Sequence, residues 1–273
     1  MFSQLNKPLI MGILNVTPDS FSDGGKYTGI NDALQQVERM LAEGVNIIDV
    51  GGESTRPGSD SVAAKEQQQR VLPVITGIRQ QLKSDILISI DTTSSEVAQA
   101  ALAAGADMIN DVSAGQRDAT ILTLAAQTEV PIILMHSQGT PKTMQDNPYY
   151  EDVVREVIDA LEDRIDAALR AGVKNDNIAI DPGIGFGKRK QDNLDLLAHL
   201  DTLVALGYPV LLGASRKRFM GTLCDVTEPS ELVTATAVTT ALGVMAGVRI
   251  FRVHDVKENR QAADVAWAIR QSR

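Results

Sequence analysis

The segment PLIMGILN, residues 8–15, is a short apolar run that ends on the amide of Asn15. Seven further segments have the same form, in which aliphatic residues lead up to a polar one. They are VNIIDVGG (45–52), ILISIDTT (86–93), DMINDVS (107–113), VPIILMHS (130–137), NIAIDPG (177–183), PVLLGAS (209–215) and VRIFRVHDV (248–256). Because these runs are apolar almost throughout, we predict eight strands buried on both faces, as in a parallel sheet.

Helical patterns lie between the strands and close on Gly, a common residue just past a helix end. They include NDALQQVERMLAEG (31–44), SSEVAQAALAAG (94–105), YYEDVVREVIDALEDRIDAALRAG (149–172), NLDLLAHLDTLVALG (193–207) and SELVTATAVTTALGVMAG (230–247). This alternation of strand and helix predicts a parallel sheet covered by helices.

Eight strand–helix units in 273 residues match the size of a (β/α)8 TIM barrel, which we predict as a single domain over residues 1–273. A doubly wound open sheet is the alternative. The barrel is favoured because every strand ends on a polar residue, as expected when all carboxyl ends surround one mouth. These residues are Asn15, Asp49, Asp91, Asn110, His136, Asp181, Ser215 and His254.

Strand alternation also turns the residues two positions earlier toward the barrel interior. Among them are Ser89, Ala179, Gly213 and Arg252. The first three are small, which predicts room for a flat ligand under the mouth.

The composition is that of an ordinary globular protein, with 44% hydrophobic residues and a net charge of −9. An acidic chain argues against a nucleic-acid or anionic-membrane surface, so any anion site is expected to be local. Cys224 is the only cysteine, which excludes a disulfide framework and fits a reducing cytosol. With no secretory or membrane-spanning pattern in the sequence, we predict a cytoplasmic protein.

Cationic side chains gather at the ends of the last two predicted strands. Arg252 and His254 share one face of the eighth strand, and Arg216, Lys217 and Arg218 follow the seventh. Loops in these positions often hold phosphate in barrel enzymes, so we predict a phosphate or pyrophosphate site. Arg216 and Arg218 have the alternative role of solvated surface charges.

Asp91, Asn110 and Asp181 offer two carboxylates and an amide from the third, fourth and sixth strands. This set suits a nitrogen heterocycle, because a carboxylate can accept two neighbouring N–H groups of a 2-amino-pyrimidinone edge. Asp91 has a competing role as the N-cap of the helix that follows it.

The loops after the first two strands are long, polar and rich in Gly and Pro, as in mobile lids. Asn15 is an oxygen ligand suited to Mg²⁺ held mostly by phosphates and waters, and Arg56 could reach an anionic co-substrate. Asp19, Ser22 and Asp23 serve equally well as plain turn residues. The Gly-rich segment GIGFG (183–187) lacks the spacing of a dinucleotide fingerprint.

Seven motifs resemble those of the dihydropteroate synthase family in order and separation, along essentially the whole chain. They are MGILNVTPDSFSDGG (11–25), IIDVGGESTRPG (47–58), INDVS (109–113), MHSQGTPKTMQ (135–145), DPGIGFGK (181–188), GASRKRFMG (213–221) and RVHDV (252–256). The resemblance implies a barrel enzyme of folate biosynthesis that joins a pterin diphosphate to para-aminobenzoate, uses Mg²⁺, forms a homodimer and is a target of sulfonamides.

The resemblance also implies roles for individual residues. The pterin contacts would be Asp91, Asn110, Asp181 and Lys217, and the diphosphate contacts Asn15, Thr55, Arg252 and His254, with Asn15 also on Mg²⁺. Phe21, Arg56 and Pro57 would build the aminobenzoate pocket, and Ser215 would be a further substrate contact. Catalysis is expected from Asp91, Asp181, Lys217, Arg252 and His254. Arg218 stands where some members of the family have Ser.

Two other functions remain open from sequence. Lys217 near a strand end is compatible with a Schiff-base aldolase. A pterin-binding module that delivers a methyl-pterin to a partner would need the same heterocycle site, but would have no use for Arg252, His254 and two long lids.

Overall fold

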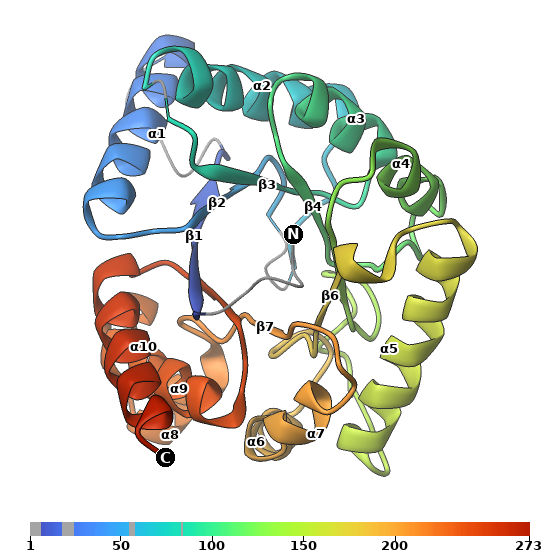
Figure 1. The fold of residues 1–273 in the computed structure, drawn as a ribbon, viewed down its shortest axis with the longest axis vertical. Coiled ribbons are helices and arrows are strands. Elements are labelled where there is room, and N and C mark those ends of the chain that lie inside the picture. The colour runs from blue at the N-terminus through green and yellow to red at the C-terminus, as the bar shows by residue number, and fades with distance from the viewer. Residues whose placement is uncertain (1–6, 18–24, 55–57, 83) are drawn as a thin grey trace.

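The computed structural model describes residues 7–17, 25–54, 58–82 and 84–273, and Figure 1 shows its strands as a ring surrounded by helices. The strands are β1 (Leu9–Asn15), β2 (Ile47–Gly51), β3 (Leu87–Asp91), β4 (Met108–Asp111), β5 (Ile132–Met135), β6 (Ile178–Asp181), β7 (Leu211–Leu212) and β8 (Ile250–Val253). Each lies within one of the eight apolar runs that predicted it.

The strands pair in parallel in the order β6-β5-β4-β3-β2-β1-β8-β7. The two ends of this series are joined by a parallel bridge between Ile180 and Val210, which brings β6 next to β7. The sheet therefore closes on itself, and the (β/α)8 barrel is confirmed over the doubly wound alternative.

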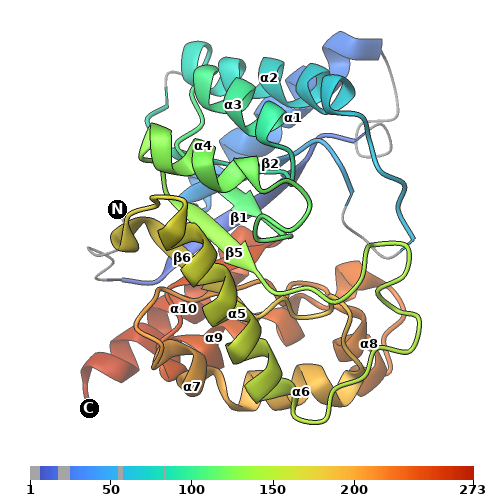
Figure 2. The same ribbon diagram turned by 90° about the vertical axis from the view of Figure 1, so that its right-hand side faces the viewer.

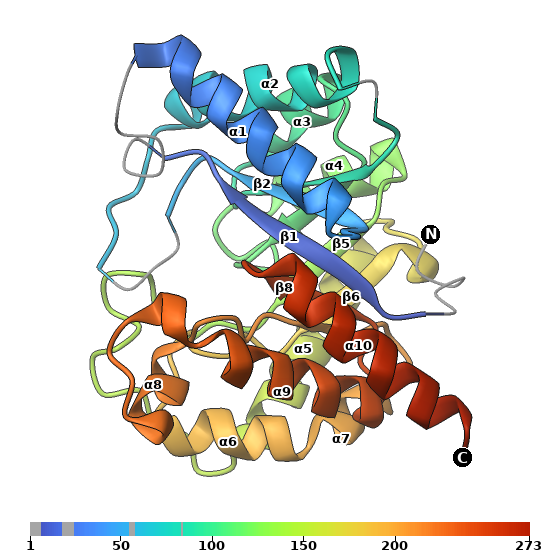
Figure 3. The same ribbon diagram turned by 90° about the vertical axis from the view of Figure 1, so that its left-hand side faces the viewer.

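The helices lie outside the ring, where α1 to α9 connect successive strands and α10 follows β8. They are α1 (Gly25–Ala42), α2 (Ala64–Gln80), α3 (Ser95–Ala103), α4 (Thr120–Thr128), α5 (Val153–Arg170), α6 (Lys190–Ala198), α7 (Leu200–Val204), α8 (Arg218–Cys224), α9 (Val233–Ala246) and α10 (Val256–Gln271), with short 3₁₀ turns η3 (Asn175–Asn177) and η4 (Pro229–Glu231). Figures 2 and 3 show them around opposite sides of the barrel. Within the described residues, every helix is too short or too polar to span a lipid bilayer.

Helix α5 shows how the sequence sets these elements. Its N-cap Asp152 accepts a hydrogen bond of 3.1 Å from the backbone N–H of Arg155, which satisfies one of the first-turn donors. Its buried residues are spaced by three or four, so they form one apolar stripe against the barrel: Val153, Val157, Leu161, Ile165 and Ala168.

Two helical segments differ from the sequence pattern. The single helix expected over 193–207 is two helices, α6 and α7, because His199 between them leaves the helical conformation (φ −117°, ψ 32°). Helix α2 continues through Pro73, a residue that normally ends or kinks a helix.

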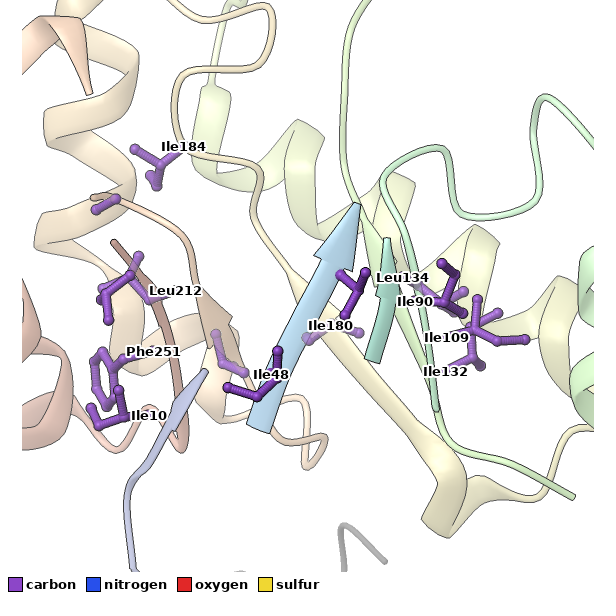
Figure 4. Close-up of a cluster of buried hydrophobic side chains, with 14 of the residues drawn as sticks. Ile10, Ile48, Ile90, Ile109, Ile132, Leu134, Ile180, Ile184, Leu212 and Phe251 are labelled. Atoms are coloured by element: carbon purple, nitrogen blue, oxygen red, sulfur yellow. The ribbon is translucent and has the colours of Figure 1, made fainter. Parts of the chain in front are cut away.

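The alternation of side chains along the strands divides the core into two clusters. A smaller cluster fills the barrel interior: Met11, Ile47, Met108, Ile133, Ala179, Leu211 and Ile250. A larger one packs the outer faces of the strands against the helices, and Figure 4 shows part of it, including Ile10, Ile48, Ile90 and Phe251. Because the interior apolar layer stops short of the carboxyl ends, the polar strand-end residues lie above it.

Candidate active site

A cavity of about 670 Å³ opens at the carboxyl ends of the strands. Its wall includes Asn15 at the end of β1, Ser215 and Lys217 beyond β7, and Arg252 and His254 at the end of β8. The structure thus gathers at one mouth five predicted site residues that lie far apart in the sequence.

The loops after β7 and β8 are bonded to each other on one side of this cavity. The backbone N–H of His254 donates to Ser215 Oγ at 3.1 Å, and that hydroxyl lies 3.0 Å from His254 Nδ1. Lys217 Nζ sits 4.2 Å from the ring centroid of Phe186, which also lines the cavity, in a cation–π contact. Lys217 and His254 are therefore held on one wall by contacts within the protein.

The two arginines around Lys217 differ in their surroundings. Arg216 donates from Nε and Nη2 to both carboxylate oxygens of Asp255, at 2.9 and 2.5 Å, and its backbone N–H donates to Thr236 Oγ1. Arg216 also has a left-handed φ of 57°, uncommon for a residue with a side chain. Its charge is compensated by Asp255, whereas Arg218 is exposed and lines the cavity.

The predicted heterocycle contacts are buried beside the cavity. Asp91, Asn110 and Asp181 are only 5%, 2% and 4% exposed. A Cβ added at Gly213, which lines the cavity, would lie 3.7 Å from Asp181 Oδ2. The glycine expected from sequence to leave room under the mouth thus has no side chain to cover this carboxylate.

Burial shifts the acid–base properties of both carboxyls. It raises the pKa of Asp91 to about 7, against the lowering effect of Arg252 and with a further rise from Asp49. It raises the pKa of Asp181 to about 6, although the N–H of Gly183 donates to this carboxylate at 2.7 Å and favours its charged form. Carboxylates that bind N–H groups must be ionised, so both are expected to work best above these values.

Arg252 connects the cationic wall with the buried carboxylates. Its Nη2 donates to Asp91 Oδ2 at 2.5 Å, and its Nε donates to Asp49 Oδ2 at 2.6 Å. Burial alone would lower the pKa of Arg252, but Asp49 and Asp91 outweigh it and raise the pKa, so the guanidinium stays charged.

The competing role of Asp91 as a helix N-cap is wrong. Helix α3 is capped by Ser94, whose side chain accepts from the backbone N–H of Val97 at 3.5 Å. Asp91 lies three residues earlier, and its carboxylate is bonded to Arg252 instead.

Lys188 is a buried residue that sequence reasoning missed. Its ammonium donates to the carbonyl oxygens of Gly183 and Phe186 at 3.0 and 3.1 Å, and contacts His136 Nδ1 at 2.9 Å. Burial lowers the pKa of Lys188 to about 7, and burial with the nearby Lys188 lowers that of His136 to about 3. His136 is thus a neutral partner of Lys188. In the sequence, the position of this lysine directly after the Gly-rich segment GIGFG is the feature that could have indicated its role.

The segment GIGFG forms a tight turn after β6 that packs against the backbone following β5. Gly183 and Gly187 have positive φ values of 67° and 64°. A Cβ at Gly183 would lie 1.8 Å from the carbonyl oxygen of His136, and one at Gly187 2.3 Å from that of Gln138. Glycine is needed here because the turn packs directly on the backbone that follows β5.

Asn15 is a fitting ligand for a metal that is held mainly by its substrate. Asn15 lines the cavity together with Lys217, Arg252 and His254, which are the candidate diphosphate contacts. Among the residues that the structure describes, no group of three or more His, Cys, Asp or Glu side chains could hold a metal. The single amide oxygen of Asn15 fits Mg²⁺, which binds through one or two protein oxygens together with phosphates and waters.

Four predicted site residues lie outside the described residues: Phe21, Thr55, Arg56 and Pro57. The same holds for Asp19, Ser22 and Asp23.

The fold and the site define a class: a (β/α)8-barrel enzyme with its active site at the carboxyl ends of the strands. The model of a family described as pterin binding enzymes matches residues 11–254. A dihydropteroate synthase of Streptococcus pyogenes serotype M6 is 52% identical over 257 residues, which cover 94% of this chain and 93% of the relative. The chain belongs to this pterin-binding family, among the dihydropteroate synthases.

Solved structures show the same relationship. A Yersinia pestis dihydropteroate synthase in a sulfonamide drug complex superposes with a TM-score of 0.91 at 41% identity, covering 98% of this chain and 96% of that one. A dihydropteroate synthase from Xanthomonas albilineans in complex with 7,8-dihydropteroate gives a TM-score of 0.86 at 41% identity, with coverage of 97% and 95%.

Proposed function

We propose that this chain is a transferase that joins 6-hydroxymethyl-7,8-dihydropterin diphosphate to para-aminobenzoate, giving 7,8-dihydropteroate and pyrophosphate in folate biosynthesis. The observation that carries the proposal is the direct contact of Arg252 with Asp91. It unites a cationic wall suited to a diphosphate with buried carboxylates suited to a nitrogen heterocycle, and one pterin diphosphate would contact both. The similarity to synthases solved with a sulfonamide and with 7,8-dihydropteroate supports the same reaction.

The chemistry of the two substrates gives the cationic side chains and the buried carboxylates different roles. An arylamine is a weak neutral nucleophile, so the main demand is departure of the diphosphate and stabilisation of the positive charge on the pterin methylene. Arg252, Lys217 and His254 would bind the departing anion, and the ionised Asp91 and Asp181 would stabilise the pterin cation. Asn110 would complete the recognition of the heterocycle. In this mechanism the bond to the diphosphate breaks well before the amine attacks.

Mg²⁺ is proposed as the metal, with Asn15 as its ligand from the chain and the diphosphate as the source of the other oxygens. When bound, Mg²⁺ would neutralise charge on the diphosphate. Ser215 is proposed as a further substrate contact, because it lines the cavity and its hydroxyl is bonded to His254.

The aminobenzoate is proposed to bind at the outer part of the cavity, near the exposed Arg218. A guanidinium there offers a bidentate partner for the benzoate carboxylate, where some members of the family have the hydroxyl of Ser. Phe21, Arg56 and Pro57 are proposed to complete this pocket, and Thr55 to contact the diphosphate. Sulfonamides, as mimics of the aminobenzoate, would compete for the same place.

We also propose that the protein is a homodimer. Helices α9 and α10 lie side by side on the outside of the barrel (Figure 3), and exposed apolar residues stand on both. Val238, Leu242, Val265 and Ile269 are 53%, 61%, 62% and 53% exposed. An apolar surface of this kind supports an interface, and a second copy of the chain is the expected partner. A cytoplasmic location, expected from the sequence pattern and the single cysteine, is part of the proposal and can be tested by cell fractionation.

The function is tested by a coupled assay of pyrophosphate release, with and without para-aminobenzoate and Mg²⁺. We expect release that needs both substrates and the metal. A module that only binds pterins would release no pyrophosphate. A Schiff-base aldolase would leave a stable adduct on Lys217 after borohydride reduction with a carbonyl substrate.

A further inference from the structure

Asp49 lies between the two parts of the site, and neither the resemblance nor the proposed mechanism gives it a role. It is on β2, completely buried, and its neighbour in the strand register is Ser89 of β3. Its Oδ2 accepts from Arg252 Nε at 2.6 Å and from Asn110 Nδ2 at 3.2 Å. One carboxylate oxygen therefore joins a proposed diphosphate contact with a proposed pterin contact.

The polar layer around Asp49 contains buried polar atoms that lower the stability of the fold. Asp49 Oδ1 and Ser89 Oγ are buried and have no hydrogen-bond partner among the described residues. An unsatisfied buried polar atom costs on the order of 1–3 kcal/mol. A carboxylate kept in such a place is better explained by what it does for Arg252 and Asn110 than by its contribution to folding.

The contacts of Arg252 show what that task is. Arg252 uses Nη2 for Asp91 and Nε for Asp49, so the two carboxylates hold different parts of the guanidinium. A pterin edge that donates N–H groups to Asp91 competes with Nη2 for the same oxygen, and a diphosphate attracts Nη2 toward the cavity. The contact between Nε and Asp49 opposes neither pterin binding at Asp91 nor the movement of Nη2 toward the diphosphate.

We propose that Asp49 is the positioning residue of the site, which holds Arg252 by its Nε while Nη2 exchanges Asp91 for the diphosphate. Its second contact orients the amide of Asn110, because a nitrogen that donates to Asp49 leaves the amide oxygen to face the heterocycle. Binding of the substrate then breaks one of two ion pairs and keeps the other. This inference rests on the proposed function and adds a residue to it.

The test compares the removal of each carboxylate, with binding of inorganic pyrophosphate and of a pterin without diphosphate measured by calorimetry. Asp49→Asn is expected to weaken pyrophosphate binding about tenfold or more, because Arg252 is then held by Asp91 alone and away from the anion. Asp91→Asn is expected to keep pyrophosphate affinity within about threefold, since Asp49 still holds Nε, while pterin binding is lost. A purely structural role of Asp49 would not separate the two ligands in this way.

Ser89→Ala is the matched control, because it changes the same layer without touching Arg252, and both affinities are expected to stay as in the wild type. Melting temperatures check the fold of each variant, and Asp49→Ser replaces Asp49→Asn if the latter does not fold. Wild-type affinity of the Asp49 variant for pyrophosphate, or an equal loss in Ser89→Ala, would overturn the proposal. These are binding measurements, so they stand apart from the turnover assay that tests the function itself.

Discussion

Arg252 on β8 and Asp91 on β3 come within 2.5 Å of each other, although 161 residues separate them in the chain. The barrel makes this contact possible because it is closed, so that strands from its two halves face one another across the interior. In an open sheet with the same strand order the two residues would lie on one face but three strands apart, which is too far for this contact. The proposed reaction depends on this closure.

Replacing Arg252 by Lys is expected to lower kcat/KM for the pterin diphosphate about a hundredfold. An ammonium keeps the charge but lacks the fork that holds Asp49 through one nitrogen while another binds Asp91 or the anion. Steady-state kinetics check this. Arg249→Lys is the control, because Arg249 precedes the same strand and lies over the ring of Trp267, 5.2 Å from its centroid. A kcat/KM that Arg252→Lys leaves unchanged would contradict the role of Arg252.

Binding of the heterocycle is expected to weaken as the pH falls through about 7 and then about 6, where Asp91 and Asp181 take up protons. The sign follows from the raised pKa values: each carboxyl is ionised and able to accept N–H groups only above its own pKa. Affinity for a pterin without diphosphate, measured by calorimetry between pH 5 and 9, excludes titration of the substrate phosphates. A flat profile over that range would show that these carboxyls do not bind the ring.

Asn15→Ala is expected to weaken Mg²⁺-dependent turnover while the fold stays intact. The side chain is half-buried at the end of β1, so its removal leaves no cavity in the core. Turnover measured as a function of Mg²⁺ concentration should show a higher half-saturation point, with an unchanged melting temperature. Asn15→Asp, which keeps an oxygen ligand, should restore part of the loss. Unchanged Mg²⁺ dependence and rate in Asn15→Ala would remove Asn15 from the mechanism.

Breaking the pair between Arg216 and Asp255 is expected to raise KM more than it lowers kcat. These residues adjoin Ser215, Lys217 and His254, so their ion pair fixes the positions of three wall residues. Arg216→Ala should also cost about 1 kcal/mol of folding stability, a value reduced because the pair is partly exposed. Thermal unfolding and kinetics measure both effects. The exchange variant Arg216→Asp with Asp255→Arg should recover part of each, because Asp tolerates a left-handed φ.

Leu242→Asp is expected to convert a dimer into monomers, because a charge would be buried at the proposed interface of α9 and α10. Light scattering after gel filtration gives the mass in solution. Leu223→Asp on α8 is the matched control, since this leucine is 52% exposed but lies on neither helix. A wild-type protein that is monomeric at micromolar concentration would refute the homodimer.

Much of the barrel could be predicted because strand positions depend on local sequence. Each apolar run contains one strand. The Asn, Asp, Ser or His that ends the run lies near the carboxyl end of that strand or just beyond it. Helices were less predictable, as α2 shows: Pro73 is a local signal against a helix, yet the helix continues through it, with Val71 and Val74 buried in the core.

The candidate site could be predicted as a set of residues but not as a set of contacts. The sequence predicted Arg252 as a diphosphate contact and Asp91 as a pterin contact or helix cap. It did not show that the two bind each other, that Asp255 compensates Arg216, or that Lys188 is buried against His136. All these pairs are distant along the chain, so no local pattern reports them.

The amino-acid sequence by itself determined the eight strands, the polar residue at the end of each and the family to which the chain belongs. These depend on periodicity, on chain order and on motifs, which are all local or linear properties. Only the tertiary structure decided which charges neutralise each other and which carboxyls change their pKa. Burial and distance set those energies, and both exist only once β8 has closed the ring beside β1.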